Sequence, residues 1–204
     1  MRLAAKTISI IFHPLLLTTY LVSLVGYYFP SFFMIAAERM RIIIAFIFCF
    51  TFILPVVNMI MFRMFGTIST YTLVSRQERL LPFVAITLIY LVMTGMFFFK
   101  LPISENLNFL LLIIALMVTV ATVLTFFYKV SVHALALWGC VGILLPLNKA
   151  MEQTSLLWPT VLAIVVAGAV MSSRLYLNAH TPRQILFGAL AGFNIGFFGM
   201  IFFF

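Results

Sequence analysis

Seven apolar stretches, each close to the length that crosses a lipid bilayer, make up most of the chain. They cover residues 8–29, 42–64, 80–99, 107–128, 132–147, 155–173 and 185–204. A membrane-spanning helix needs ~20 apolar residues, and a helix satisfies its own backbone hydrogen bonds in lipid. The pattern therefore predicts an all-α fold, a polytopic transmembrane helical bundle of about six to seven spans.

Composition agrees with this prediction. Hydrophobic residues make up 65% of the 204 residues and charged residues 8%, whereas a soluble domain is about half apolar and about a quarter charged. These values exclude a soluble enzyme, a disordered chain and a disulfide scaffold. The short connecting loops leave no room for a second domain, so we expect one integral membrane domain over residues 1–204, in the cytoplasmic membrane if the source is bacterial.

The charge balance indicates which partners the chain can bind. Twelve Lys and Arg residues face four Glu and no Asp, a net charge of +8, and the cations are scattered singly. This pattern favours membrane lipids with anionic headgroups or a phosphate-bearing substrate over nucleic acid. Without Asp there are no Asp clusters for Mg²⁺, and no His pair has zinc spacing. We therefore expect no metal and no cofactor.

The cations gather on one side of the predicted bundle. With seven spans, alternate loops lie on opposite sides. One side, called side A, receives the N-terminus and residues 65–79, 129–131 and 174–184. Side A carries eight cations against a single carboxylate, Glu78, while the opposite side B carries four cations and three Glu.

Three side-A segments combine a cation with a hydroxyl group or a His. They are residues 75–82, 129–133 and 173–184. A single cation at a helix end usually reaches the membrane interface, but intramembrane charges also mark functional sites. Three such segments on one side favour a phosphate pocket, since Arg binds phosphate with two hydrogen bonds and Lys with a point charge. A His beside such a pocket can attack phosphorus or protonate a leaving oxygen.

The third segment carries the most specific motif. Ser173-Arg174, five further residues, His180, three further residues and Gln184 resemble the third signature of the type 2 phosphatidic acid phosphatase superfamily, Ser-Arg-x5-His-x3-Asp. Gln184 departs from the Asp of that signature. The ending His180-Thr181-x-x-Gln184 is similar to that of dolichyl diphosphatases, so Gln184 is compatible with an active enzyme.

The other two segments resemble the remaining signatures less closely. Ser131-Val132-His133 resembles the end of the second signature, Pro-Ser-Gly-His. Arg79 before Pro82 resembles the end of the first, Lys-x6-Arg-Pro, although Thr72 stands at the Lys position. The order along the chain is the family's order. The resemblance covers a phosphatase-like core of about residues 65–200.

The resemblance implies a metal-independent hydrolysis of a lipid phosphate or polyprenyl diphosphate through a phosphohistidine. His180 would be the nucleophile and His133 the proton donor to the leaving oxygen. Arg174, Arg79 and Ser131 would bind the phosphate. Lys129, two residues before Ser131, is our candidate for the cation missing at Thr72.

Two supporting residues complete the predicted site. Ser173 and Gln184 would orient the catalytic groups. Gln184 has a second possible role, because Thr181-Pro182-Arg183-Gln184 has the form of a capping box at a helix start. His13, before Pro14 in the first stretch, is expected to be a polar group facing the bundle.

Two other functions compete with a hydrolase. One is a lipid phosphotransferase, which would need an acceptor. The other is a non-catalytic lipid-binding or assembly protein with a degenerate phosphatase fold, in which His180→Ala would change no phosphate release.

The membrane orientation and the oligomeric state stay open. The excess of cations places side A in the cytoplasm, whereas most members of the resembling family act on the outer or lumenal face. In the last stretch Gly188, Gly192 and Gly196 share one helix face. This spacing predicts close helix packing or, as the alternative, a dimer contact.

Overall fold

The structure is a computed structural model that describes residues 2–71, 73, 75–101, 103–150 and 156–204. Thr72, at the position of the family's Lys, and Glu152 lie outside the described residues. The described residues form helices joined by turns. In chain order the helices are α1 (Arg2–Ile11), α2 (Pro14–Tyr28), α3 (Pro30–Phe33), α4 (Ala37–Phe48), η1 (Cys49–Ile53), α5 (Leu54–Met64), α6 (Arg76–Phe99), α7 (Glu105–Phe127), α8 (Val132–Ala150), α9 (Leu157–Tyr176) and α10 (Pro182–Phe203).

Over the ranges that the structure describes, six helical segments are long and apolar enough to cross a membrane. They are Ala37–Met64, Arg76–Phe99, Glu105–Phe127, Val132–Lys149, Leu157–Tyr176 and Pro182–Phe203. The first of them joins α4, the short π-helix η1 and α5 into one segment. A seventh span results if α1 and α2, bent by 57° at their junction, are counted as one. The predicted all-α polytopic bundle is confirmed.

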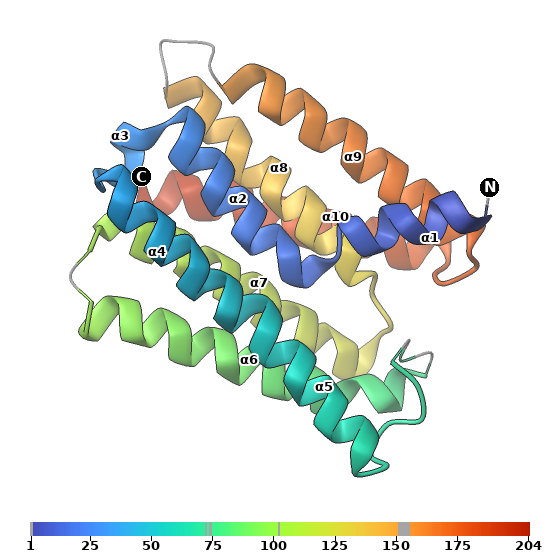
Figure 1. Ribbon diagram of the computed structural model, residues 1–204. Helices are drawn as coiled ribbons and strands as arrows, with labels where there is room; N and C mark the ends of the chain where they lie inside the picture. The colour runs from blue at the N-terminus through green and yellow to red at the C-terminus, as the bar shows by residue number, and fades with distance from the viewer. Residues whose placement is uncertain (1, 72, 74, 102, 151–155) are drawn as a thin grey trace.

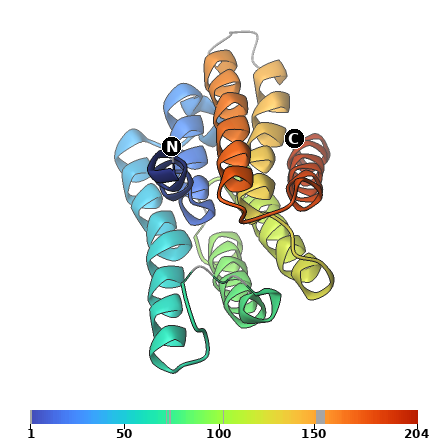
Figure 2. The same cartoon turned by 90° about the vertical axis from the view of Figure 1, so that its right-hand side faces the viewer.

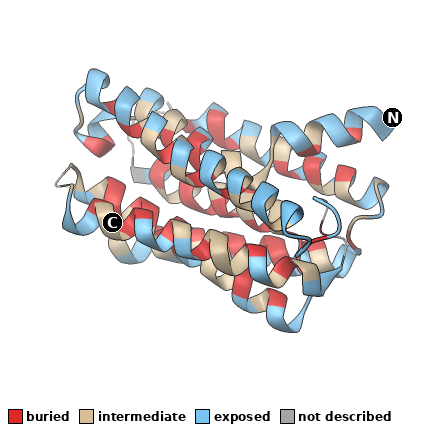
Figure 3. Cartoon of the chain, turned by 60° about the horizontal axis from the view of Figure 1, so that its bottom comes forward, coloured by how far each residue is buried: buried red, intermediate tan, exposed pale blue. Residues whose placement is uncertain are grey.

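The outer surface of the bundle is apolar. Large side chains such as Phe202, Trp158 and Ile42 are 82%, 76% and 71% exposed. Figure 3 shows that buried residues lie on the inner faces of the helices and exposed residues on the outer faces. A soluble monomer rarely exposes large contiguous apolar patches, so this surface fits contact with lipid.

The two ends of the bundle correspond to the two predicted sides. The N-terminus and the turns that follow α5, α7 and α9 lie at one end, and the C-terminus lies at the other (Figure 1). Figure 2, seen from the side-A end, shows α4 and α5 along one edge, α10 along the opposite edge, and α8 and α9 between them. The side-A cations therefore gather at one end, as the alternation of loops predicts.

The tightest contact in the bundle joins α8 and α10. A Cβ atom on any of the three glycines would collide with a backbone oxygen in α8 or in the residue just before it: Gly188 meets Ser131 O, Gly192 meets Leu135 O and Gly196 meets Gly139 O. The prediction of close helix packing is confirmed. Since α8 covers this glycine face, the face does not serve as a dimer contact.

Candidate functional site

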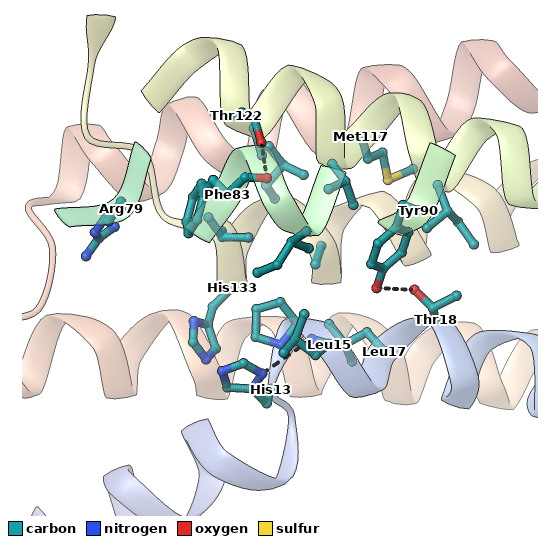
Figure 4. Close-up of a pocket in the computed structure, with 18 of the residues that line it drawn as sticks. His13, Leu15, Leu17, Thr18, Arg79, Phe83, Tyr90, Met117, Thr122 and His133 are labelled. Carbon is teal, nitrogen blue, oxygen red and sulfur yellow. Dashed lines mark hydrogen bonds between the residues drawn. The ribbon is translucent and has the colours of Figure 1, made fainter. Parts of the chain in front are cut away.

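A cavity of about 410 Å³ runs from the side-A end into the middle of the bundle. Its walls come mainly from α2, α5, α6, α7 and α8. Five polar residues gather in its lining near side A: His13, Arg79, His133, Arg174 and His180. Figure 4 shows Arg79, His133 and His13 toward one end of the cavity, and Tyr90 with Thr18 farther along it.

His180 lies in the turn between α9 and α10 and is 8% exposed. Its Nδ1 lies 3.0 Å from Oε1 of Gln184. The same oxygen accepts the backbone N–H of Thr181 at 3.2 Å, which identifies it as the carbonyl oxygen. A carbonyl oxygen only accepts, so Nδ1 of His180 carries the proton and Nε2 is left with a free lone pair.

Burial lowers the pKa of His180 to about 4. The hydrogen bond with Gln184 raises this pKa, while the charges of Arg79, Arg174 and Lys129 lower it further. At neutral pH the ring is therefore uncharged, and an uncharged imidazole is the form that can act as a nucleophile.

Gln184 performs both of the roles considered for it. Its side chain closes a capping box with Thr181 at the start of α10, and its Oε1 orients His180. Its backbone oxygen also accepts the N–H of Ser131 at 3.1 Å, which joins the start of α8 to the start of α10. The second and third motif segments are thus held together by a direct hydrogen bond.

His133 lies in the first turn of α8 and is half-buried. Its Nε2 lies 3.1 Å from the carbonyl oxygen of Ser9 in α1. Because this oxygen only accepts, Nε2 donates the proton, and Nδ1, which has no hydrogen-bond partner among the described residues, is the nitrogen without a proton.

The two arginines of the site have no carboxylate partner among the described residues. Arg79 is 8% exposed, and its Nε donates to the Leu73 carbonyl oxygen at 2.8 Å. Nε of Arg174 is buried and has no hydrogen-bond partner in the described part of the chain. A buried, unpartnered guanidinium nitrogen is costly, so this arrangement favours an anionic ligand that is bound there in function.

Lys129 lies outside the main cavity. It lines a second pocket, which also includes His180, together with Asn178, Thr181 and Gln184. Burial and the charges of Arg79 and Arg174 lower the pKa of Lys129. Lys129 therefore adds to the positive potential at His180, while its direct contact with a phosphate stays a prediction.

Two predicted residues use their hydroxyl groups for local structure. Ser131 is fully buried, its Oγ accepts the N–H of Ala134 at 3.4 Å, and it is not among the lining residues of the described cavity. Ser173 donates its hydroxyl proton to the carbonyl oxygen of Ala169, at 2.8 Å, within α9. Neither hydroxyl makes a described hydrogen bond to the two histidines.

The remaining charges of the first segment stabilise the chain around the site. Arg76 donates to the carbonyl oxygen of Phe126 at 2.7 Å and ties α6 to α7. Glu78 accepts the N–H of Ser69 at 3.0 Å and the hydroxyl of Ser75 at 3.2 Å. The only side-A carboxylate is thereby engaged by the loop before α6.

His13 is the site residue for which the sequence contains no motif. It faces the bundle, as expected, and it also lines the cavity beside His133, with ring centroids 5.5 Å apart and an interplanar angle of 83°. The one signal was its place before Pro14 in an apolar stretch. The phosphatase-like core of residues 65–200 therefore does not contain every residue of the cavity wall.

Beyond the histidines the cavity is mainly apolar and contains one hydrogen-bonded polar pair. Its walls there are Leu21, Ile86, Ile114, Met117, Val118 and Ile143. The buried Tyr90 lies at this part of the cavity, with its hydroxyl 3.3 Å from that of Thr18. The cavity thus joins a cationic end to an apolar interior, which is the shape that an amphiphilic phosphate requires.

Within the described ranges no cluster of three or more His, Cys, Asp or Glu side chains is placed to hold a metal ion. Comparison of the chain with protein-family models, with curated proteins and with solved structures finds no match. The resemblance to the type 2 phosphatidic acid phosphatases therefore stays a prediction from the motifs, and the function must be argued from the site.

Proposed function

We propose that the protein hydrolyses the phosphate or diphosphate group of a membrane lipid, without a metal ion, through a phosphohistidine at His180. The observation that carries the proposal is the buried cationic end of the cavity. There Arg79 and Arg174, whose Nε has no described hydrogen-bond partner, lie beside two histidines, with no described carboxylate to neutralise them.

The first chemical step uses the free lone pair of His180. Nε2 of His180 attacks phosphorus, the N–P bond forms, and the bond from phosphorus to the leaving oxygen breaks. His133, whose Nδ1 takes up a proton when the anionic substrate binds, gives that proton to the leaving oxygen and keeps its Nε2–H on Ser9 O. The oxygen leaves as a lipid alcohol or, from a diphosphate, as a lipid monophosphate. Arg79 and Arg174 stabilise the charge that builds on the phosphoryl oxygens.

The second step restores the enzyme. Water attacks the phosphorus of the phosphohistidine and gives a proton to His133, which is now the base. The N–P bond breaks, inorganic phosphate is released, and Nε2 of His180 regains its lone pair. Gln184 holds Nδ1–H throughout, so the same nitrogen is presented in both steps.

The apolar part of the cavity supports a lipid as the substrate. Pockets for small molecules commonly measure about 300–1,000 Å³ and are mostly apolar with a few placed polar groups. A volume of about 410 Å³ suits one chain better than two. We therefore favour a single-chain lipid phosphate, which includes a polyprenyl diphosphate.

The experiment is phosphate release by detergent-purified protein in EDTA, against a panel of lipid monophosphates and diphosphates. We expect release that persists in EDTA and falls to background in His180→Ala. The matched control is Arg39→Gln, which removes an exposed cation of α4 at the opposite end and should keep full activity.

A second measurement identifies the intermediate. Rapid quenching with a ³²P-labelled substrate should give a protein-bound label that is stable in base and labile in acid, the behaviour of phosphohistidine. Equal release by wild type and His180→Ala would overturn the proposal and favour the lipid-binding alternative. Release that requires an added alcohol acceptor would favour the phosphotransferase.

A further inference from the structure

The break in the first span has a local cause. Pro14 has no N–H, and its ring would collide with the carbonyl group of Ile10 in a continuous helix. α1 therefore ends at Ile11, α2 begins at Pro14, and the two helices meet at an angle of 57°. At the junction the N–H of His13 donates to Ile10 O at 3.2 Å instead of continuing the i to i−4 pattern.

This change releases one carbonyl group. In a continuous helix the N–H of His13 would donate to Ser9 O. In the broken span Ser9 O instead accepts from Nε2 of His133 at 3.1 Å. Ser9 is buried, with 5% of its surface exposed, so water does not compete freely for its carbonyl oxygen. The break at Pro14 thus makes Ser9 O available as a hydrogen-bond acceptor for His133, which lies 124 positions away in sequence.

The same break places a second group against His133. His13 precedes the first turn of α2 as its N-cap, and its Nδ1 accepts the N–H of Leu15 at 3.4 Å. With Nδ1 fixed as acceptor, the ring packs edge to face on His133, 5.5 Å between centroids. Figure 4 shows the two rings side by side on one wall of the cavity.

We propose that the broken first span is the positioning element of His133: Ser9 O fixes the proton on Nε2, the ring of His13 fixes the plane of the imidazole, and Nδ1 is the atom presented to the substrate. Its catalytic consequence rests on the proposed function: Nδ1 takes up a proton when the anionic substrate binds and then gives it to the leaving oxygen, while Nε2–H stays on Ser9 O. The positioning itself is a property of the folded protein without substrate. Ser9 and His13 are positioning residues, since they act through His133.

The first test needs no substrate. The chain contains three histidines, so ¹⁵N-histidine spectra of the full protein in lipid bilayers can be assigned with one His→Ala variant for each. We expect the proton of His133 on Nε2, and we expect that nitrogen to show a dipolar contact with the ¹³C-labelled carbonyl of Ser9. A proton on Nδ1, or no contact with Ser9, would overturn the proposal even if the enzyme is active.

The second test closes the break. Pro14→Ala restores an N–H that can bond to Ile10 O, which lets His13 N–H return to Ser9 O. We expect loss of the contact between His133 and Ser9 and a fall in kcat of about tenfold, part of the ~10²–10⁴ that proton transfer can contribute. KM should change less than kcat, because the arginines that bind the phosphate are untouched.

The matched control is Pro30→Ala. Pro30 also begins a helix, but it is exposed and lies outside the lining of the cavity. It should leave both the spectrum and kcat unchanged. Loss of the Ser9 contact in Pro14→Ala with wild-type kcat would overturn the catalytic part of the proposal.

A pair of variants at His13 separates its ring from its cap. His13→Asn keeps a side chain that can cap α2 but removes the ring, and His13→Phe keeps the ring but removes the cap. If the ring positions His133, kcat falls about tenfold in His13→Asn and is largely rescued in His13→Phe, against the same ~10²–10⁴ range. The reverse order would show that His13 has only a structural role.

These outcomes are distinct from a failure of the proposed function. If wild type releases no phosphate but the spectra place Nε2–H against Ser9 O, the positioning holds and the hydrolase proposal fails. If wild type is active and the contact is absent, the hydrolase proposal holds and the positioning fails.

Discussion

The site lies between two regions that are built differently. On one side α8 and α10 are so close that glycines meet the backbone of the neighbouring helix, and a hydrogen bond joins the starts of the two helices. On the other side α2, α5 and α6 line a cavity of about 410 Å³. The close pair fixes His133 relative to His180, while the wall opposite leaves room for a substrate.

The largest effect should follow from pushing the close pair apart. In Gly192→Ala the new Cβ would meet the carbonyl oxygen of Leu135, which is backbone and cannot turn away. We expect a loss of about 3 kcal/mol or more in unfolding free energy, at the upper end for overpacked cores. Unfolding by SDS titration in mixed micelles measures it.

The control for this variant is a glycine in open space. Gly168 in α9 has no atom within 4 Å of an added Cβ, so Gly168→Ala should gain about 0.5–1 kcal/mol from helix propensity. Equal unfolding free energies of Gly192→Ala and Gly168→Ala would contradict the close packing of α8 against α10.

Removing the charge at the cavity should have the opposite effect on stability. Arg174→Met replaces a guanidinium whose Nε is buried without a partner by an apolar side chain. We expect a gain of about 1 kcal/mol or more in unfolding free energy. Phosphate release should fall by about 10²–10³, as for other groups that stabilise a transition-state charge.

The unfolding free energy and the rate of phosphate release of Arg174→Met can be measured on the same purified sample. Arg183→Met, an exposed arginine at the start of α10, is the matched control and should change neither. A destabilised but active Arg174→Met protein would show that this arginine serves the fold and not the substrate.

The pH dependence should respond to the partner of His180. Gln184→Glu keeps the capping box and places a carboxylate on Nδ1, which raises the pKa of His180 from about 4 by about 1–3 units. The nucleophile must be neutral, so the acidic limb of the activity profile should move to higher pH by the same amount. Gln77→Glu, on an exposed part of α6, is the control.

Stability should change with pH in a linked manner. The pKa of His180 in the folded protein, about 4, lies below the ordinary 6.5, so the unfolded chain binds this proton first as the pH falls. Protonation of His180 in the unfolded chain therefore lowers the unfolding free energy as the pH drops from 6.5 to about 4. Gln184→Glu should reduce this loss, and an unchanged slope would contradict the assigned hydrogen bond.

The smallest effect should come from narrowing the cavity. Ala121 lies on the α7 wall, and Ala121→Leu would occupy space that we assign to the lipid chain. KM for a long-chain lipid phosphate should rise about tenfold, equivalent to about 1.4 kcal/mol. KM for a short soluble phosphate ester should not change.

Ala169→Leu, on an exposed part of α9, is the matched control. Equal effects of Ala121→Leu on the long-chain and the short substrates would place the lipid chain outside the cavity.

The existence and order of the spans could be predicted from the sequence, because a long run of apolar residues is enough to identify a membrane-spanning helix. The predicted start of the stretch 42–64 was five residues too late. In the structure the helix begins at Ala37 and includes Glu38, Arg39 and Arg41. Charged residues at a helix end carry no apolar signal, so composition cannot place such a boundary. The break at His13-Pro14 was predictable because proline acts locally.

The site was predictable only where its residues are close in sequence. Arg174, His180 and Gln184 lie within one turn and its flanking helices, so their spacing already indicates their proximity. The contact of His133 with Ser9 depends on how α1 packs along α9 and beside α8, which no local pattern encodes. The inward burial of Ser131 depends in the same way on the approach of α10 to α8.

One amide oxygen, Oε1 of Gln184, receives two N–H groups. The orientation of the His180 ring and the first turn of α10 are therefore coupled. If the Gln184 side chain moves, the hydrogen bond to His180 and the hydrogen bond to the Thr181 N–H are both lost. The proposed nucleophile, His180, therefore needs no ligand to set the direction of its ring, and no orientational entropy of that ring would be lost when a substrate binds. Position 184 therefore requires a side chain that can accept a hydrogen bond from the His180 ring and from the Thr181 N–H at the same time.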